Sequence, residues 1–363
     1  MLVDIIAGAR PNFMKIAPII AAIKKAALEG KDIKYRLIHT GQHYDKKMSG
    51  DFFEQLGIPE PDINLEAGGG TQAEQTAAIM IRYEKVLMEH RPDLVLVVGD
   101  VTSTMACSIS AKKLNNIKVA HIEAGIRSGD WTMPEEINRM VTDAITDYFF
   151  TTSETANINL KKAGIDDSRI FFVGNTMIDT LLTQMPNFKE PPVWNELGLK
   201  PKEYIVMTLH RPANVDEEDG LRKLMSAIVD SSRGLPLIFP VHPRTAKMLK
   251  SVGIEAPNLH MIDPLGYLEF NYLVQHAKAV VTDSGGITEE TTVMNVPCMT
   301  LRNNTERPET CTIGTNELLG TDPVAIPPAF DILFNNEWKK GAIPDLWDGK
   351  TSGRIVDVLL RLF

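Results

Sequence analysis

The sequence has few cysteines and no excess of basic residues. Its three cysteines, Cys107, Cys298 and Cys311, lie far apart and lack the close spacing of metal ligands, so we expect reduced thiols of a cytoplasmic protein. Acidic residues outnumber basic ones, 47 to 38, and the net charge is -9. General binding to nucleic acid requires a basic surface, so it is not expected, although a local basic patch remains compatible with this total.

Long hydrophobic runs are also missing. No apolar run approaches the roughly 18 residues that a membrane-spanning helix needs. The first residues, MLVDIIAGARPNF, lack the basic start and long apolar core of a secretion signal. The remaining composition, 44% hydrophobic and 23% charged, is that of an ordinary globular protein, and 363 residues are enough for two domains. We therefore predict a cytoplasmic protein without a membrane partner.

Short apolar segments alternate with helical patterns along the chain. A polar stretch with several prolines, about 177–202, interrupts this alternation and is typical of a domain junction. The segments predicted as strands before and after it are 2–8, 35–41, 93–100, 117–125, 147–153, 204–210, 235–242, 258–263, 279–284 and 296–301. Continuous apolar strands separated by helices indicate parallel sheets that are covered by helices on both faces.

This pattern predicts an α/β fold with two doubly wound, Rossmann-like domains. We place the first domain at 1–176 and the second at 177–349, and the amphipathic helix at about 350–363 is expected to pack back on the first domain. Parallel sheets of this kind bind ligands outside the carboxyl ends of their strands. A ligand is therefore expected in a central cleft that the two sheets face.

Two basic residues follow the first predicted strand. Gly8-Ala9-Arg10-Pro11 lacks the GxGxxG spacing of a dinucleotide fold, so nothing here indicates NAD. Arg10 and Lys15 lie near a helix N-terminus, where unpaired amides and the helix dipole add to their charge and favour a phosphate. Both could equally be surface residues that pair with local acids.

Carboxylates follow the other strands of the first half. Asp100 ends the strand DLVLVVG, Glu123 precedes a glycine after an apolar strand, and Glu135 follows Met133-Pro134 at a predicted helix start. Helix capping and compensation of the helix dipole also account for acids at such positions. The three residues nevertheless share one predicted edge of a sheet, where grouped carboxylates suit acid/base chemistry. Arg127 and Arg139, in the same region, either brace the loop or reach a substrate.

The second half has basic and glycine-rich strand ends. His210-Arg211 and His242-Pro243-Arg244 each finish a strand, and Ser284-Gly285-Gly286 opens a helix. Glycines at a helix start let backbone amides approach an anion, and Glu290, one turn later, could accept hydrogen bonds from a ribose. An ordinary N-cap and structural histidines are the alternatives. Together these features favour a nucleotide phosphate site over packing alone.

Eleven blocks of the chain resemble a known family. In order they are GARPNFMKIAP, HTGQHYD, VVGDVTST, HIEAGIRSGD, MPEEINR, GNTMIDTLL, TLHRP, PVHPRT, IDPLGYLEF, TDSGGITEE and NNTERPET. Together they resemble the non-hydrolysing UDP-N-acetylglucosamine 2-epimerases, which have a GT-B fold, over nearly the whole chain. The resemblance implies a homodimer that interconverts UDP-N-acetylglucosamine and UDP-N-acetylmannosamine for polysaccharide biosynthesis.

The resemblance also implies the mechanism and the site residues. UDP leaves by anti elimination to give 2-acetamidoglucal and returns by syn addition, with no cofactor and no metal. The implied catalytic residues are Asp100, Glu123, Glu135 and His210, and which carboxylate removes the C2 proton is left open. The implied residues for binding the UDP-sugar are Arg10, Lys15, His242, Phe270, Ser284, Gly285, Gly286, Glu290 and Arg307.

Several alternatives stay open at this point. TGQHYD, HRP and HPRT also resemble epimerases of UDP-2,3-diacetamido-2,3-dideoxyglucuronate, whereas TERPE (305–309) favours the simpler sugar. A GT-B glycosyltransferase and a non-catalytic UDP-sugar sensor are further readings. The segment INLEAGGGTQ has glycines where relatives carry an arginine and a glutamine for an activating second UDP-N-acetylglucosamine, so the sequence does not predict that activation.

Overall fold

The computed structural model describes residues 1–41, 56–114, 117–215, 217–241, 246, 249 and 253–363. They form two compact units, Met1–Thr183 with Asp345–Phe363, and Gln184–Pro344. The predicted domains, 1–176 and 177–349, remain a prediction, because a compact unit need not be an independently folding domain.

The first unit contains a seven-stranded parallel sheet of order β3-β2-β1-β4-β5-β6-β7. Its strands are β1 (Leu2–Ala7), β2 (Lys34–His39), β3 (Ile63–Asn64), β4 (Leu94–Val98), β5 (Lys118–Ile122), β6 (Tyr148–Thr151) and β7 (Ile170–Phe172). The helices are α1 (Arg10–Leu28), α3 (Gln72–Glu89), α4 (Thr102–Lys113), α5 (Pro134–Ile145), α6 (Glu154–Lys162), α7 (Thr176–Gln184) and α16 (Thr351–Leu362), with a 3₁₀ turn η1 (Asp167–Arg169).

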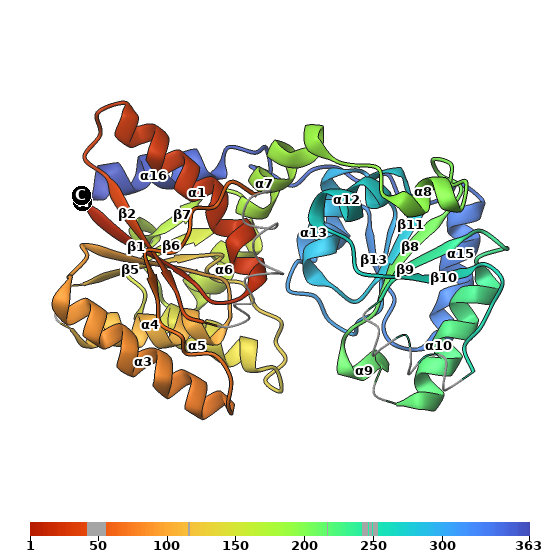
Figure 1. The fold of residues 1–363 in the computed structure, drawn as a ribbon, viewed down its shortest axis with the longest axis horizontal. Coiled ribbons are helices and arrows are strands. Elements are labelled where there is room, and N and C mark those ends of the chain that lie inside the picture. The colour runs from red at the N-terminus through yellow and green to blue at the C-terminus, as the bar shows by residue number, and fades with distance from the viewer. Residues whose placement is uncertain (42–55, 115–116, 216, 242–245, 247–248, 250–252) are drawn as a thin grey trace. The chain divides into compact units, whose positions relative to one another are not determined.

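Helices cover both faces of this sheet (Figure 1). Ile6, Val95 and Val97 of the sheet form one buried cluster with residues of α3 and α4. On the other face, α16 packs against α1. The start of α16 is held by α7, where the Asp179 carboxylate accepts hydrogen bonds from the backbone N–H groups of Thr351 (3.0 Å) and Ser352 (2.7 Å). The last helix therefore belongs to the first unit.

The second unit contains a six-stranded parallel sheet of order β10-β9-β8-β11-β12-β13. Its strands are β8 (Ile205–Thr208), β9 (Leu237–Pro240), β10 (Leu259–Ile262), β11 (Ala279–Thr282), β12 (Cys298–Thr300) and β13 (Asn316–Leu318). Its helices are α8 (Pro192–Glu196), α9 (Pro212–Val215), α10 (Glu218–Ser231), α12 (Tyr267–His276), α13 (Gly285–Val293), α14 (Pro308–Thr312) and α15 (Ile326–Phe334), with 3₁₀ turns η2 (Met185–Asn187) and η3 (Pro323–Ala325).

The central strand β8 shows why this second sheet needs helices on both faces. Ile205 and Met207 lie in a buried cluster with residues of α10 and α15. Tyr204 and Val206, which alternate with them, lie in a second buried cluster with residues of α8 and α12. Successive side chains of a strand point to opposite faces, so a continuously apolar strand must be buried on both.

Each sheet changes its winding direction at one place. In the first unit this switch point lies between β1 and β4, and in the second unit it lies between β8 and β11. The first unit's switch point is crowded, since a Cβ atom at Gly8 would overlap the Ser103 hydroxyl at the start of α4. Parallel sheets bind ligands beside such points, so both are the places to look for a site.

The predicted α/β class with two parallel sheets is confirmed, and every predicted strand is present. The short strands β3, β7 and β13, which have two or three residues each, were not predicted. The sequence pattern also predicts a helical segment around 43–55, which lies outside the described residues. Among the described residues, no helix is long and apolar enough to cross a membrane, and the three cysteines are free thiols.

Candidate functional site

Glu123 lies at the carboxyl end of β5 and forms an ion pair with Lys15 of α1. The distance from Lys15 Nζ to Glu123 Oε2 is 2.8 Å, and the side chains are 14% and 4% exposed, respectively. The backbone of Glu123 has a φ of 68°, in the left-handed region that costs a non-glycine residue roughly 1–2 kcal/mol. Such strained residues cluster at functional sites, and this one directs a carboxylate to the end of the sheet.

Asp100 follows β4 and lies beside this ion pair. A Cβ atom at the preceding residue, Gly99, would be 3.4 Å from Lys15 Nζ and 3.7 Å from Glu123 Oε2. The Asp100 carboxylate accepts a hydrogen bond from Arg139 of α5, and its side chain is 29% exposed. The structure therefore brings Asp100, Glu123 and Lys15 together beside the switch point of the first sheet.

The adjacent acids Glu135 and Glu136 of α5 have different environments. Glu136 is buried and accepts hydrogen bonds from Arg139 (2.7 Å), the Ser128 hydroxyl (3.0 Å) and two backbone N–H groups of the preceding loop. Burial raises the pKa of Glu136, but these hydrogen bonds outweigh it and the pKa is lowered overall. Glu135 is half-buried and makes no ion pair or hydrogen bond within the described residues. Its carboxylate is thus uncommitted, and it shares a helix face with Arg139, four residues later.

A buried network supports the loop that carries Glu123. Asp143 of α5 contacts His121 Nδ1 at 2.7 Å, Arg127 Nη2 at 2.6 Å and the backbone N–H of Gly125 at 3.1 Å. The other nitrogen of His121 lies 2.8 Å from the carbonyl oxygen of Gly99. Burial raises the pKa of Asp143, but His121 and Arg127 lower it overall. Arg127 and Arg139 therefore both brace this region through carboxylates of the first unit.

His210 lies at the switch point of the second sheet, where β8 ends, and faces Asp283 at the end of β11. The distance from His210 Nδ1 to Asp283 Oδ1 is 2.7 Å. Asp283 is completely buried, whereas the His210 side chain is 62% exposed. Burial raises the pKa of Asp283, but the hydrogen bond and charge of His210, together with backbone N–H groups, lower it to about 2. The pair therefore joins a buried acceptor to an accessible imidazole.

The helix α13 begins beside this pair. Its N-cap residue, Ser284, makes no capping hydrogen bond with its side chain, and no acid lies in the first turn. The position of a Cβ on Gly285 would be 3.7 Å from Arg302 Nη1 and 3.8 Å from Glu306 Oε2, which form an ion pair at 2.7 Å. Gly286 follows in the first turn. An uncapped helix N-terminus with a guanidinium beside it is an arrangement that favours an anion.

Glu290 lies one turn further along α13 and is 4% exposed. Its Oε1 accepts a hydrogen bond of 2.8 Å from the hydroxyl of Tyr267 on α12. Burial raises the pKa of Glu290 to about 7, and the charge of Glu289 contributes, although Tyr267 opposes the shift. A carboxylate in this state can ionise readily when a ligand supplies further donors.

Two of the other predicted binding residues have described side chains, and two do not. Arg307 is buried and pairs with Glu289 of α13 at 2.6 Å. Phe270 of α12 is half-buried and packs against the cluster formed by α8, α12 and β8. Arg10 begins α1, but its side chain lies outside the described part, as does the whole of His242. Within the described part, no group of three or more His, Cys, Asp or Glu side chains is arranged to hold a metal ion.

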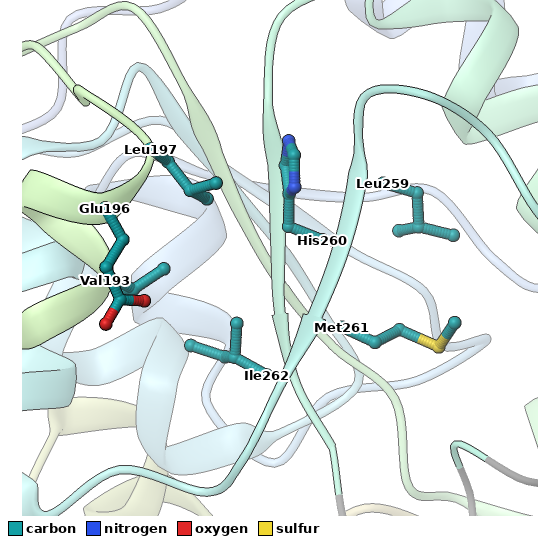
Figure 2. A pocket seen from close by; sticks show the side chains of 7 residues that line it. All are labelled: Val193, Glu196, Leu197, Leu259, His260, Met261 and Ile262. Carbon is teal, nitrogen blue, oxygen red and sulfur yellow. The ribbon is translucent and has the colours of Figure 1, made fainter.

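One cavity lies away from all of these residues. It has a volume of about 400 Å³ and lies between α8 and the edge strand β10, where His260 and Ile262 project toward Val193 and Leu197 (Figure 2). None of the predicted site residues lines it. The cavity therefore gives no support to the predicted chemistry and is separate from the strand ends described above.

Sequence reasoning missed the residues that hold the predicted ones in place. Asp143, Asp283 and Tyr267 lie 22, 73 and 23 residues from the partners that they contact. Glu136, for which the sequence predicts no role beyond that of an acid at a helix start, is a buried acceptor of several hydrogen bonds. The only signal in the sequence was the position of Asp283 directly after a predicted strand, beside the glycines.

Comparisons with known proteins show the family to which this chain is similar. A family model described as UDP-N-acetylglucosamine 2-epimerase matches residues 25–360. The UDP-N-acetylglucosamine 2-epimerase of Methanocaldococcus jannaschii is 40% identical over 372 residues, which cover 99% of both chains. The UDP-2,3-diacetamido-2,3-dideoxy-D-glucuronate 2-epimerase of Pseudomonas aeruginosa is 39% identical and covers 98% of this chain and 99% of its own.

Solved structures extend the similarity to three dimensions. The M. jannaschii epimerase in complex with UDP-GlcNAc and UDP has a TM-score of 0.87 and covers 99% of this chain and 100% of its own. The Neisseria meningitidis UDP-GlcNAc 2-epimerase bound to UDP-GlcNAc is 29% identical, with a TM-score of 0.88 and the same coverage. These matches confirm the predicted GT-B-like fold class. With two parallel sheets, ionisable residues at both switch points and a family match over most of its length, the chain belongs to the UDP-N-acetylglucosamine 2-epimerase family.

Proposed function

We propose that this chain interconverts UDP-N-acetylglucosamine and UDP-N-acetylmannosamine by inverting C2 of the sugar. UDP and the C2 proton leave by anti elimination to give 2-acetamidoglucal, and UDP then returns by syn addition together with a proton at C2, which inverts that carbon. The observation that carries the proposal is the group of Asp100, Glu123 and Lys15 at the switch point of the first sheet, in a chain of this family.

The chemistry requires two kinds of residue. The C2 hydrogen is not next to a ring carbonyl, so a base removes it only as departure of UDP builds positive character at C1. That departure needs electrostatic stabilisation of the diphosphate. The proton transfers need carboxylates near C1 and C2.

The proton-transfer role fits the first unit. Glu123 is buried and held by Lys15, and Asp100 is held by Arg139, so both carboxylates are fixed in position. Glu135 is the acid without such a partner in the described residues. We propose all three as the acidic catalytic residues, with no assignment of the C2 base among them.

The nucleotide-binding role fits the second unit. We propose that the amides of Gly285 and Gly286 and the Ser284 hydroxyl bind the diphosphate at the uncapped start of α13. Glu290 accepts hydrogen bonds from the ribose, and Phe270 lies near the uracil. Arg10, Lys15, His242 and Arg307 supply further charge, and His210 takes part in the proton transfers.

The test is epimerisation in deuterated water. Purified protein is incubated with UDP-N-acetylglucosamine, and both isomers are followed by NMR. We expect deuterium at C2 of both N-acetylhexosamines, because the proton returned to the intermediate comes from solvent. Absence of turnover would contradict the proposal, and release of free N-acetylmannosamine would indicate a hydrolysing epimerase instead.

A second substrate is favoured by one specific observation, the 39% identity to the P. aeruginosa diacetamido-glucuronate epimerase over nearly the whole chain. The reaction at C2 would be the same, so the residues above would keep their roles. Incubation with each sugar nucleotide separately distinguishes the two, because only the true substrate exchanges its C2 hydrogen at an appreciable rate.

The finer features are proposed on the same basis. We propose a cytoplasmic homodimer that supplies polysaccharide biosynthesis, with the predicted domains 1–176 and 177–349 contributing the acids and the nucleotide site, respectively. Sedimentation of the purified protein tests the oligomeric state. A monomer with full activity would overturn that part alone.

A further inference from the structure

The carboxylate of Asp283 receives hydrogen bonds on both oxygens. Oδ1 lies 2.7 Å from His210 Nδ1, and Oδ2 accepts from the backbone N–H groups of His210 (3.0 Å) and Arg211 (2.8 Å). The amide nitrogen of Asn214 donates to the same Oδ2 at 3.1 Å. Backbone N–H groups can only donate, so Oδ2 is fixed as an acceptor.

This geometry decides which nitrogen of His210 carries hydrogen. Asp283 is completely buried and surrounded by donors, which keep its pKa at about 2, so it is ionised. An ionised carboxylate only accepts, and the nitrogen that faces it at 2.7 Å must therefore be Nδ1–H. In the neutral imidazole the lone pair is then on Nε2, and the side chain is 62% exposed.

We propose that Asp283 is a positioning residue that fixes the Nδ1–H tautomer of His210, so that Nε2 is the atom that exchanges a proton with the substrate. Asp283 itself stays ionised throughout, and the proton moves only between Nε2 and a substrate oxygen. The inference rests on the proposed function for the role of His210, but the tautomer is a property of the protein alone. Buried carboxylates orient catalytic histidines in this way in unrelated enzymes.

A purely structural role for Asp283 must be separated from this one. The same carboxylate ties the loop after β8 to the end of β11, so its removal also loosens the loop. The backbone N–H of His210 reaches both carboxylate oxygens, but Asn214 donates to Oδ2, whereas the imidazole faces Oδ1. Asn214→Ala is therefore a matched control that loosens the loop but keeps the His210–Asp283 pair.

The decisive variant is Asp283→Asn. The loop N–H groups require an oxygen, so the new amide NH₂ group faces Nδ1 and reverses the tautomer of His210. We expect kcat to fall by roughly 10²–10⁴-fold, as expected when a histidine is held in the wrong tautomer. UDP affinity should change by less than about twofold, since no nucleotide contact is removed. In Asn214→Ala, kcat should stay within about threefold of the wild type.

The tautomer is read directly by ¹⁵N NMR of the side-chain nitrogens at about pH 9, well above the ordinary pKa of histidine. The signals of His210 are assigned by their loss in His210→Gln. The wild type should show Nδ1–H, and Asp283→Asn should show Nε2–H. A wild-type protein with hydrogen on Nε2 overturns the inference, even if Asp283→Asn does not fold.

The kinetic outcomes separate the two proposals. Equal losses of kcat in Asp283→Asn and Asn214→Ala would overturn the positioning role and leave a structural one. If the wild type has the expected tautomer but neither binds UDP nor exchanges the C2 hydrogen, the proposed function fails while the assignment of the tautomer stands.

Discussion

The two switch points use opposite arrangements of charge. In the first unit, acids follow the strands and cations from helices hold them, as Lys15 holds Glu123 and Arg139 holds Asp100. In the second unit, basic residues follow the strands and acids hold them, as Asp283, itself at the end of β11, holds His210 and Glu306 holds Arg302. Each of these four strand-end groups is thus held by a side chain that it contacts.

This difference teaches how one fold provides two functions. A carboxylate held by a cation is suited to proton transfer, because its position and ionisation are fixed. A basic group at a strand end beside an uncapped helix start is suited to an anion. The fold supplies the same strand ends in both units, and the side chains placed there decide the chemistry.

The largest expected effect tests the acidic edge of the first unit. Replacing Glu123 with Gln removes a proposed proton-transfer group but keeps the side-chain volume. We expect turnover to fall roughly 10²–10⁴-fold. UDP affinity, measured by calorimetry, should change little, because Glu123 is not among the residues proposed to bind the nucleotide.

Glu84→Gln is a suitable control for this variant, since Glu84 is an exposed acid on α3. Its turnover should equal that of the wild type. Unchanged turnover in Glu123→Gln would remove Glu123 from the catalytic set. It would also contradict the assignment of proton transfer to the acids of the first unit.

The second effect concerns the buried acid of the second unit. Burial raises the pKa of Glu290 from 4.5 to about 7, so the ionised form is disfavoured in the folded protein. The wild type and Glu290→Gln should be equally stable below about pH 4.5, where the carboxyl is protonated in both the folded and unfolded states. The wild type should lose stability as pH rises toward 7, and at pH 8 Glu290→Gln should be more stable by about 3 kcal/mol.

Urea unfolding at pH 4 and pH 8 measures this difference. A stability difference that does not change between the two pH values would show that Glu290 is not destabilised by ionisation. The same result would remove the contrast with Asp283, whose pKa of about 2 makes the ionised form favourable.

The same pKa predicts the pH dependence of ligand binding. In the proposed nucleotide site, ribose hydroxyls donate to the ionised carboxylate of Glu290, so UDP-N-acetylglucosamine should bind more weakly as pH falls below about 7. Well below this pH, the loss of affinity approaches tenfold for each pH unit. The diphosphate of this ligand is esterified at both ends and does not titrate in this range. Calorimetry from pH 5 to 8 tests this pH dependence of affinity. Glu290→Gln should bind UDP-N-acetylglucosamine weakly at every pH in this range, without the pH dependence.

A smaller effect is expected from the cation of the first unit. Lys15→Ala leaves the 4% exposed carboxylate of Glu123 without its ion-pair partner. We expect the free energy of unfolding at pH 7 to fall by about 2 kcal/mol, because a largely buried charge loses its partner. Lys25→Ala, an exposed lysine on the same helix, should change stability by less than about 0.5 kcal/mol. Equal effects in the two variants would mean that the pair adds no stability.

The smallest expected change in stability separates two neighbouring acids. Glu135→Gln should alter the free energy of unfolding by less than about 0.5 kcal/mol, because Glu135 has no partner in the described residues. Its turnover should nevertheless fall at least tenfold. Glu136→Gln should instead lose about 1–2 kcal/mol of stability, because it weakens several buried hydrogen bonds. The reverse pattern would exchange the catalytic assignment between them.

Most of the fold could be predicted because its signals are local. The strands β1, β4, β8 and β11 are predominantly apolar runs, and a glycine or a polar residue follows each of them within two positions. Short edge strands such as β3 and β13 were missed, because two or three residues carry no readable period. The family followed from the ordered blocks, and the comparisons confirm it.

The site itself could be predicted only in part. The positions of Asp100, Glu123 and His210 at strand ends were readable, because parallel strands bring their carboxyl ends to one edge. The ionisation state of each group and the partner that it contacts could not be read from the sequence. Glu123 and Lys15 are separated by 108 residues, and nothing local indicates that they meet at 2.8 Å.

The sequence alone determined the alternation of strands and helices, the residues placed at the strand ends and the family to which the chain belongs. Only the tertiary structure decided which of these residues are held, by what partner and in what ionisation state. The physical reason is that periodicity and turn chemistry act between neighbours in the chain. Burial and charge pairing instead depend on groups such as Asp283 and His210, which folding alone brings into contact.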